Sequence, residues 1–324
     1  MDERFLEQAR REPRPEFARG LRERLRGIEQ EDAAPGFRLN PALAGVFAAV
    51  AVALLFTLPS VRVSAQAMLD LFRVRNFTAV QFDPARIEKL KSMKSQNQML
   101  PFDNVETITD PGPLRAFPTP EAAGLAANLA VRQIRFLPSG LAPDSVLMRG
   151  EGQARFTLHE ATLRAALETL DLRDVDVPAG LDGKTINVHT LPVVVQTYRN
   201  GGARAALMQA RSPEVALPPG IDLERLGVIG LRMLGLDAAE ARRVASGIDW
   251  HTTLVIPVPL DASTFRRITV HGQPGLLVTR SGKSGDGERR REGTCVLWTE
   301  NDIVYGLETT SGPPDAMQMA ESVQ

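Results

Sequence analysis

The side chains that most often carry catalysis or metal binding are scattered along this chain. The four histidines are His159, His189, His251 and His271, and no two of them are three or four residues apart. The only cysteine, Cys295, is not close in sequence to any of them. Protein zinc sites take Cys and His ligands at short, regular spacings. The sequence therefore predicts no metal site.

The string Asp249-Trp250-His251-Thr252-Thr253 is the densest group of reactive side chains. On a strand, Asp249, His251 and Thr253 would share one face, which is a geometry suited to acid-base chemistry. No nucleophile accompanies them, and the sequence contains neither a Gly-x-Ser-x-Gly elbow nor a Walker phosphate loop. We interpret the string as a tryptophan anchor at the start of a strand, and we expect no catalytic residues, no cofactor and no enzyme activity.

A third pattern points to a partner rather than to a reaction. Phe17, Leu21, Leu25 and Ile28 recur at spacings of four, four and three, with arginines between them, as in an amphipathic helix. Nothing else in this short segment can cover such a stripe. The stripe therefore docks on a cytoplasmic protein, lies on the inner membrane surface or stays partly disordered. We take these four residues as the candidate partner-binding site.

The segment that follows predicts a membrane anchor. Leu39 to Val61 runs for 23 residues without a charge, which is the length of a helix that spans a bilayer. Five arginines precede it and three follow it within a comparable length, and this bias predicts a cytoplasmic N-terminus. Three alternatives stay open, namely a buried soluble helix, the inverted orientation and a signal peptide cleaved near Val63-Ser64-Ala65. We favour an uncleaved signal anchor in the bacterial cytoplasmic membrane.

The remainder of the chain is long enough for one sizeable core or two small ones. We expect a cytoplasmic segment at 1–38, the span at 39–61, a juxtamembrane connector at 62–118 and an extracytoplasmic domain at 119–324, either as one body or as lobes 119–211 and 212–324. A single cysteine excludes a fold held by internal disulfides. The net charge of −1 gives no general attraction to nucleic acid, and we expect no direct contact with it.

The expected fold class is α+β, with one transmembrane helix followed by a domain of mainly antiparallel sheet and packed helices. Proline, capping residues and apolar periodicity predict helices near 63–72, 84–98, 121–129, 158–170, 222–234, 237–246 and 313–323. Alternating and β-branched stretches predict strands near 77–82, 131–137, 152–157, 175–178, 185–189, 193–198, 254–257, 267–272, 275–279, 294–299 and 303–308. We expect 98–118 to be irregular because it contains four prolines.

Two stretches resemble a known kind of protein. The inner motif is Arg14-Pro15-Glu16-Phe17-Ala18-x-x-Leu21-Arg22-x-x-Leu25, and one predicted span follows it. The closing pattern runs from Val270-x-Gly272-x-x-Gly275 through Val296-Leu297-Trp298-x-x-x-Asp302-x-x-Tyr305 to a helix ending Met319-Ala320-Glu321-Ser322-Val323. Together they resemble bacterial anti-sigma-factor-like single-pass membrane proteins with an extracytoplasmic domain of unknown function. Residues 1–38 contain no His or Cys, unlike the zinc-binding anti-sigma domains.

The resemblance implies an envelope regulator or sensor and supplies no catalytic residue. Our leading expectation is a non-enzymatic regulatory anchor, whose outer domain senses or binds something and whose inner helix contacts a cytoplasmic protein such as a sigma factor. The alternative is an anchored binding or carrier module for a lipid, a lipoprotein or another ligand. An apolar groove between sheet and helices would favour this alternative.

Overall fold

The computed structural model describes residues 71–95, 105–260, 263–280 and 293–324. The chain divides into two compact units, Met1–Gly45 and Val46–Gln324, and all of the described residues belong to the second. The predicted span at 39–61 and the stripe from Phe17 to Ile28 lie outside these ranges and stay predictions. No helix in the described ranges is both long enough and apolar enough to cross a membrane.

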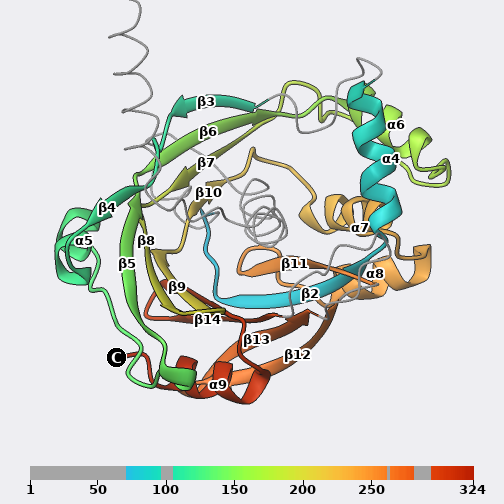
Figure 1. Ribbon diagram of the computed structural model, residues 1–324. Helices are drawn as coiled ribbons and strands as arrows, with labels where there is room; N and C mark the ends of the chain where they lie inside the picture. The colour runs from blue at the N-terminus through green and yellow to red at the C-terminus, as the bar shows by residue number, and fades with distance from the viewer. Residues whose placement is uncertain (1–70, 96–104, 261–262, 281–292) are drawn as a thin grey trace, which may run out of the picture. The chain divides into compact units, whose positions relative to one another are not determined.

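Three sheets form the framework of this unit (Figure 1). The largest has the order β12-β13-β14-β15-β9-β8-β5-β4, with bounds Ser263–Val270, Gln273–Arg280, Gly293–Glu300, Ile303–Thr309, Ala203–Arg211, Val193–Asn200, Ala142–Arg149 and Arg115–Phe117. The second has the order β1-β10-β7-β6-β3, with bounds Leu71–Phe72, Glu214–Ala216, Thr185–Thr190, Gly152–Thr157 and Val105–Thr109. The third pairs β2 (Asn76–Phe82) with β11 (Thr253–Pro259) in parallel, whereas the strand pairs of the other two sheets are antiparallel.

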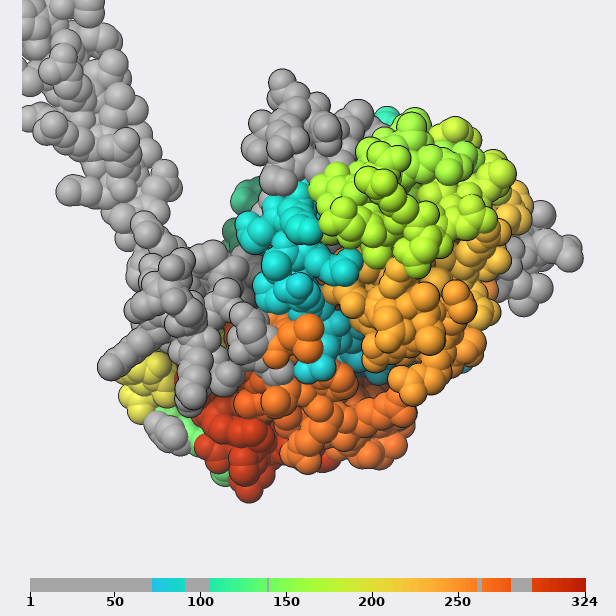
Figure 2. Space-filling view, turned by 90° about the vertical axis from the view of Figure 1, so that its right-hand side faces the viewer, coloured from blue at the N-terminus to red at the C-terminus, as the bar shows by residue number. Residues whose placement is uncertain are grey.

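The described part contains six α-helices. They are α4 (Pro84–Ser95), α5 (Pro120–Ala127), α6 (Glu160–Thr169), α7 (Leu223–Leu234), α8 (Ala238–Ser246) and α9 (Pro313–Glu321). Helix α4 contacts α6 and α7, and α7 contacts α8, so that these four helices gather on one face (Figure 2). Helix α9 packs on β12, β14 and β15 instead. The predicted α+β class with mostly antiparallel strands and packed helices is confirmed for this part of the chain.

Local signals explain the elements that the sequence predicted well. Asp222 caps α7 by accepting a hydrogen bond from the Arg225 amide at 2.9 Å, and Asp237 caps α8 through the Glu240 amide at 2.8 Å. Gly235 ends α7 with a φ of 118°, a conformation that glycine adopts without strain. The last hairpin turns at Asn301 and Asp302, between the two predicted strands, and both residues have positive φ.

Other expectations about elements were wrong. Phe72 belongs to strand β1 rather than to a helix, because it pairs with β10 and its ring is buried. The stretch expected to be irregular contains β3 and β4, whose strand form depends on pairing with β6 and β5. Residues 131–137 make only an isolated bridge between Ile134 and Val323, and 175–178 form a loop. Strands β5, β9 and β10 were not predicted.

The start of α6 is not stabilised by a capping box, although Thr157 and Glu160 have the spacing of one. The residue before α6 is His159, whose side chain caps nothing. Instead, Asp182 accepts from the Glu160 amide at 2.7 Å, and the Glu160 carboxylate accepts from the Gly180 amide at 2.7 Å. The start of α6 is therefore stabilised by the loop at 180–182 rather than by its own flanking residues.

Strand β14 is buried on both faces and divides the core. One face carries Val296 and Trp298, which pack with α9, and Trp298 stacks on Tyr305 with ring centroids 4.9 Å apart. The other face carries Cys295 and Leu297, which pack against strands β2 and β11. This double burial explains the nearly continuous apolar run in the sequence of the strand.

Trp250 anchors the turn before β11, as the sequence suggested. Its Nε1 donates to the Ala245 carbonyl at 2.9 Å. The ring lies on Gly227 of α7, where the absence of a side chain makes room for it. Gly230 belongs to the same helix, but a Cβ added there would meet no other atom within 4 Å.

These two glycines give a paired prediction. Gly227→Ala should lower stability by about 1–3 kcal/mol, because the new methyl group overlaps the indole ring and forces it away from Ala245. Gly230→Ala should raise stability by about 0.5–1 kcal/mol through better helix propensity alone. Melting temperatures of the two variants and the wild type would check this. Equal shifts in both variants would contradict the proposed packing.

The Cys295 thiol should be inert in the folded protein. Burial, and to a smaller extent the nearby Glu308 carboxylate, raise its pKa to about 12, although the Arg280 guanidinium acts in the opposite direction. Because the thiolate is the reactive form, iodoacetamide should leave Cys295 unmodified at pH 7 and modify it fully in concentrated urea. Mass spectrometry of the intact protein measures both. Rapid labelling without denaturant would refute the buried assignment.

Candidate functional site

The residues around Trp250 form a turn and not a reactive cluster. Asp249 accepts from the His251 amide at 3.0 Å and from the Thr252 hydroxyl at 2.8 Å. These two bonds, the hydroxyl bond first, lower the pKa of the Asp249 carboxyl, so the carboxylate stays charged and serves as a turn cap. Strand β11 starts only at Thr253. The geometry supports the structural role that was predicted for this string, namely a tryptophan anchor at the start of a strand.

The histidines lie apart from one another. His159 is exposed at the start of α6, and His251 is exposed in the turn described above. His189 lies on β7, with Glu151 on one side of its ring at 2.8 Å and Glu214 on the other at 3.2 Å. His271 lies in the turn between β12 and β13. In the ranges that the structure describes, no three His, Cys, Asp or Glu side chains form a group that could hold a metal ion.

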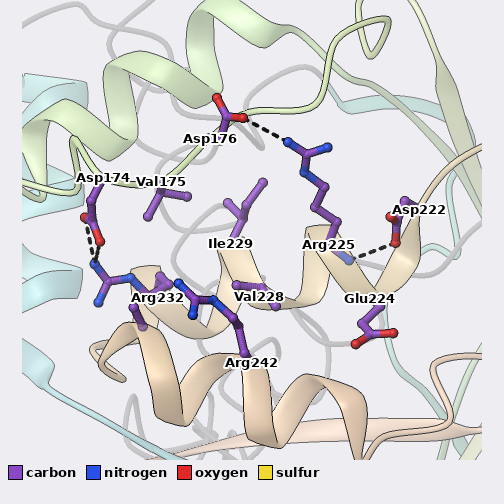
Figure 3. Close-up of a pocket in the computed structure, with 11 residues that line it drawn as sticks. Asp174, Val175, Asp176, Asp222, Glu224, Arg225, Val228, Ile229, Arg232 and Arg242 are labelled. Atoms are coloured by element: carbon purple, nitrogen blue, oxygen red, sulfur yellow. Dashed lines mark hydrogen bonds and ion pairs between the residues drawn. The ribbon is translucent and has the colours of Figure 1, made fainter.

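A cleft lies between helices α7 and α8 and the loop at 174–176 (Figure 3). Its volume is about 400 Å³. Helices α7 and α8 supply most of its wall, and the loop supplies the rest. Its lining residues are Asp174, Val175, Asp176, Asp222, Glu224, Arg225, Val228, Ile229, Arg232, Ala238 and Arg242.

Two ion pairs fasten the loop to α7. Arg232 donates through Nη2 to both carboxylate oxygens of Asp174, at 2.8 and 2.6 Å, and its Nη1 donates to the Leu236 carbonyl at 3.1 Å. Only 13% of the Arg232 side chain is exposed, but 59% of the Asp174 side chain is, so solvent screens this pair from the carboxylate side. Arg225 donates to Asp176 at 3.1 Å in a more exposed setting. The wall of the cleft is therefore held in place before any ligand arrives.

Two further charges in the cleft form no ion pair with another described residue. Arg242 lies beside Arg232 at one end, and Glu224 lies at the opposite end near Asp222 (Figure 3). Glu224 and Arg232 are eight positions apart on α7, which corresponds to about 12 Å along a helix. Val175, Val228 and Ile229 line the space between the ends. The cleft thus suits a small polar ligand with an anionic group, an apolar middle and a cationic group.

The sequence did not reveal this cleft. Val175 to Pro178 was interpreted as a strand, and neither Asp174 nor Asp176 was singled out as a candidate site residue. The available signal was the repeated Asp-x-Asp ahead of Pro178, which is more typical of a loop than of a central strand. The partners of these carboxylates lie on α7, 49 positions after Asp176 and 58 positions after Asp174. A pattern within a short window of sequence does not show such distant pairs.

A second feature connects the cleft helices with the first described residues of the chain. We call Leu71 to Phe82 the strap, because it runs between the sheets and touches all three of them. Strand β1 pairs with β10, β2 pairs with β11, and the Arg75 carbonyl accepts from the Thr299 hydroxyl of β14 at 2.9 Å. The Val74 amide donates to the Ser212 hydroxyl at 2.8 Å.

The two faces of the strap contact different parts of the core. Phe77 packs with Leu254 and Leu297, toward the largest sheet. Val80 packs with Leu231 of α7 and with α8, beneath the cleft helices. The Asp83 amide, directly after the strap, donates to the Leu234 carbonyl at the end of α7 at 3.2 Å. A shift of α7 would therefore reach the strap directly.

The strap should be sensitive to loss of a single hydrogen bond. Ser212→Ala leaves the buried Val74 amide without its acceptor, and we expect a loss of about 1–3 kcal/mol in unfolding free energy. Ser246→Ala removes an exposed hydroxyl bonded to the Arg243 carbonyl and should change stability by less than about 0.5 kcal/mol. Urea denaturation of both variants measures the difference. Equal effects would contradict the role of Ser212.

Comparison of the chain with known protein families, with curated proteins and with solved structures finds no match in any of the three. Its function is therefore inferred from its own residues and geometry.

Proposed function

We propose that this protein is a membrane-anchored regulatory or sensory protein of the bacterial envelope, anti-sigma-factor-like in its organisation and without enzyme activity. In this proposal Leu39 to Val61 crosses the cytoplasmic membrane once, with the N-terminus inside. The domain outside receives the signal. The stripe formed by Phe17, Leu21, Leu25 and Ile28 contacts a cytoplasmic regulatory protein such as a sigma factor.

The strap is the observation that carries this proposal. Leu71 lies only ten positions after the end of the predicted span. Between there and Phe82, Phe72, Val74, Phe77 and Val80 are buried in the core, while Arg75, Asn76 and Gln81 are exposed. An inert anchor needs no such burial, since a flexible linker would hold the domain equally well. A buried connection supports the transmission of movement from the domain to the segment that precedes it.

The cleft supplies a place where a signal could act. A ligand that bridges Arg242 and Glu224 would bind α7 and α8 together, and α7 contacts Val80 of the strap through Leu231. Such a ligand would favour one position of α7 only if it binds that position more tightly. The cleft and the strap therefore support a sensory domain in which binding and connection share one helix.

The alternative is an anchored binding or carrier module whose inner segment has no partner. The cleft supports binding of a ligand in this case too. Its charged ends favour a small polar molecule, whereas a carrier for a lipid or a lipoprotein needs a predominantly apolar groove. We therefore rank a carrier of acyl chains below the sensory function.

The inner stripe separates these two functions experimentally. We expect the full-length protein, crosslinked in membranes and purified, to bring down a specific cytoplasmic regulatory protein. Phe17→Asp with Leu21→Asp should reduce that capture at least about tenfold, because two charges on an apolar helix face are costly to bury. Quantitative mass spectrometry of the captured proteins provides the measurement.

Arg19→Gln with Arg26→Gln is the matched control, because it changes the net charge by the same amount on the opposite face of the predicted helix. This control should retain the partner. A partner lost equally from both variants would indicate simple charge attraction, and no specific partner in the wild type would move the assignment to the binding module.

A further inference from the structure

His271 lies where α9 ends on the largest sheet. The residue occupies the tight turn between β12 and β13 with a φ of 50°, which is uncommon for a residue other than glycine. Its Nδ1 is 3.0 Å from the Glu300 carboxylate of β14, and its Nε2 is 2.9 Å from the Glu321 backbone carbonyl of α9. Its own amide donates to the Glu321 carboxylate at 3.1 Å. One side chain thus joins a sheet strand to the last turn of α9.

Both atoms that face the ring can only accept hydrogen bonds. A carbonyl oxygen has no proton to donate, and an ionised carboxylate has none either. Both ring nitrogens of His271 must carry a proton to satisfy the two contacts. A neutral imidazole would turn one lone pair toward an oxygen and lose one of the two bonds.

The carboxylate of Glu300 is kept ionised by its other partner. Arg132 donates to both of its oxygens, at 2.7 and 2.9 Å. This pair lowers the pKa of Glu300, burial opposes the shift and the bond to His271 adds to it. The acceptor on the β14 side therefore remains charged over the range in which a histidine titrates.

Among the described residues, the charged groups that act on the ring are Glu300 on β14 and Glu321 on α9. Arg132 lies behind Glu300, and its guanidinium is 5.8 Å from the ring of Tyr305 on β15. Burial acts to lower the pKa of His271, but the bonds and charges of Glu300 and Glu321 outweigh it and raise the pKa above its usual value of 6.5.

Helix α9 covers buried polar atoms as well as apolar surface. Its Ala316, Met319 and Ala320 pack on the cluster that contains Trp298 and Tyr305. The Trp298 Nε1 and the Tyr305 hydroxyl are buried there without a hydrogen-bond partner among the described residues. Release of the end of α9 would bring water closer to this cluster.

We propose that His271 is a proton-dependent latch, which in its doubly protonated form holds the carboxyl-terminal end of α9 on the largest sheet and in its neutral form releases that end. The latch is a property of this domain and does not depend on the function proposed above. The docking of α9 would thereby respond to the proton concentration around this domain.

The direction of the response follows from the raised pKa. A group whose folded pKa exceeds its unfolded value stabilises the folded form fully below the unfolded value, here 6.5, and loses this contribution as the pH rises through the folded pKa. The latch is therefore closed in mildly acidic conditions and opens on the alkaline side.

Hydrogen exchange of the full-length protein in detergent, followed by mass spectrometry, tests the latch. The readout is the protection of residues 313–324 relative to that of α7, which cancels the intrinsic pH dependence of exchange. We expect this ratio to fall by at most about tenfold per pH unit as the pH rises above 6.5, since one proton is linked to opening. In His271→Gln the ratio should not change with pH.

His159→Gln is the matched control, because His159 is exposed and its side chain caps nothing. This control should keep the wild-type pH dependence. A flat ratio in the wild type, or a pH-dependent ratio that survives in His271→Gln, would overturn the latch. Should His271→Gln not fold, Glu321→Gln still tests it, because removal of this charge should move the loss of protection to lower pH, and an unchanged midpoint would count against the proposal.

Discussion

The burial of the strap on both of its faces is the constraint on which the rest of this unit depends. Strand β2 pairs with a single neighbour, β11, so its remaining polar groups and its apolar side chains must be satisfied by other elements. Phe77 meets the largest sheet and Val80 meets α7 and α8. Helix α7 also packs against α6 through Ile229 and Met233, so the strap supports one side of α7 and α6 supports another.

The elements whose signals are local were predictable from the sequence. Helices α7 and α8 carry their caps at Asp222 and Asp237, and Gly235 separates them, so a window of a few residues contains the evidence. The same holds for the hairpin at Asn301 and Asp302, whose turn type follows from the two residues in its centre. For these segments intrinsic preference and tertiary structure agree.

The elements that depend on distant partners were not predictable in this way. Phe72 follows an apolar spacing that favours a helix, but pairing with Val215 makes it a strand. The cap of α6 comes from Asp182, and the acceptor for the Val74 amide comes from Ser212, 138 positions away. The cleft was missed for the same reason, since Asp174 is positioned by its ion pair with Arg232, which lies on another element.

Strand β14 relates the cleft, the strap and the latch to one another. Its side chains alternate, so that Trp298 faces α9 while Leu297 faces the strap. The interior is closely packed and transmits strain across such a short distance. A change in the docking of α9 would therefore occur one sheet thickness from the strap, and the strap contacts α7 of the cleft on its other side through Leu231. Within the described residues the strap thus lies between the proposed latch and the cleft, which is where the proposed sensory function requires a connection.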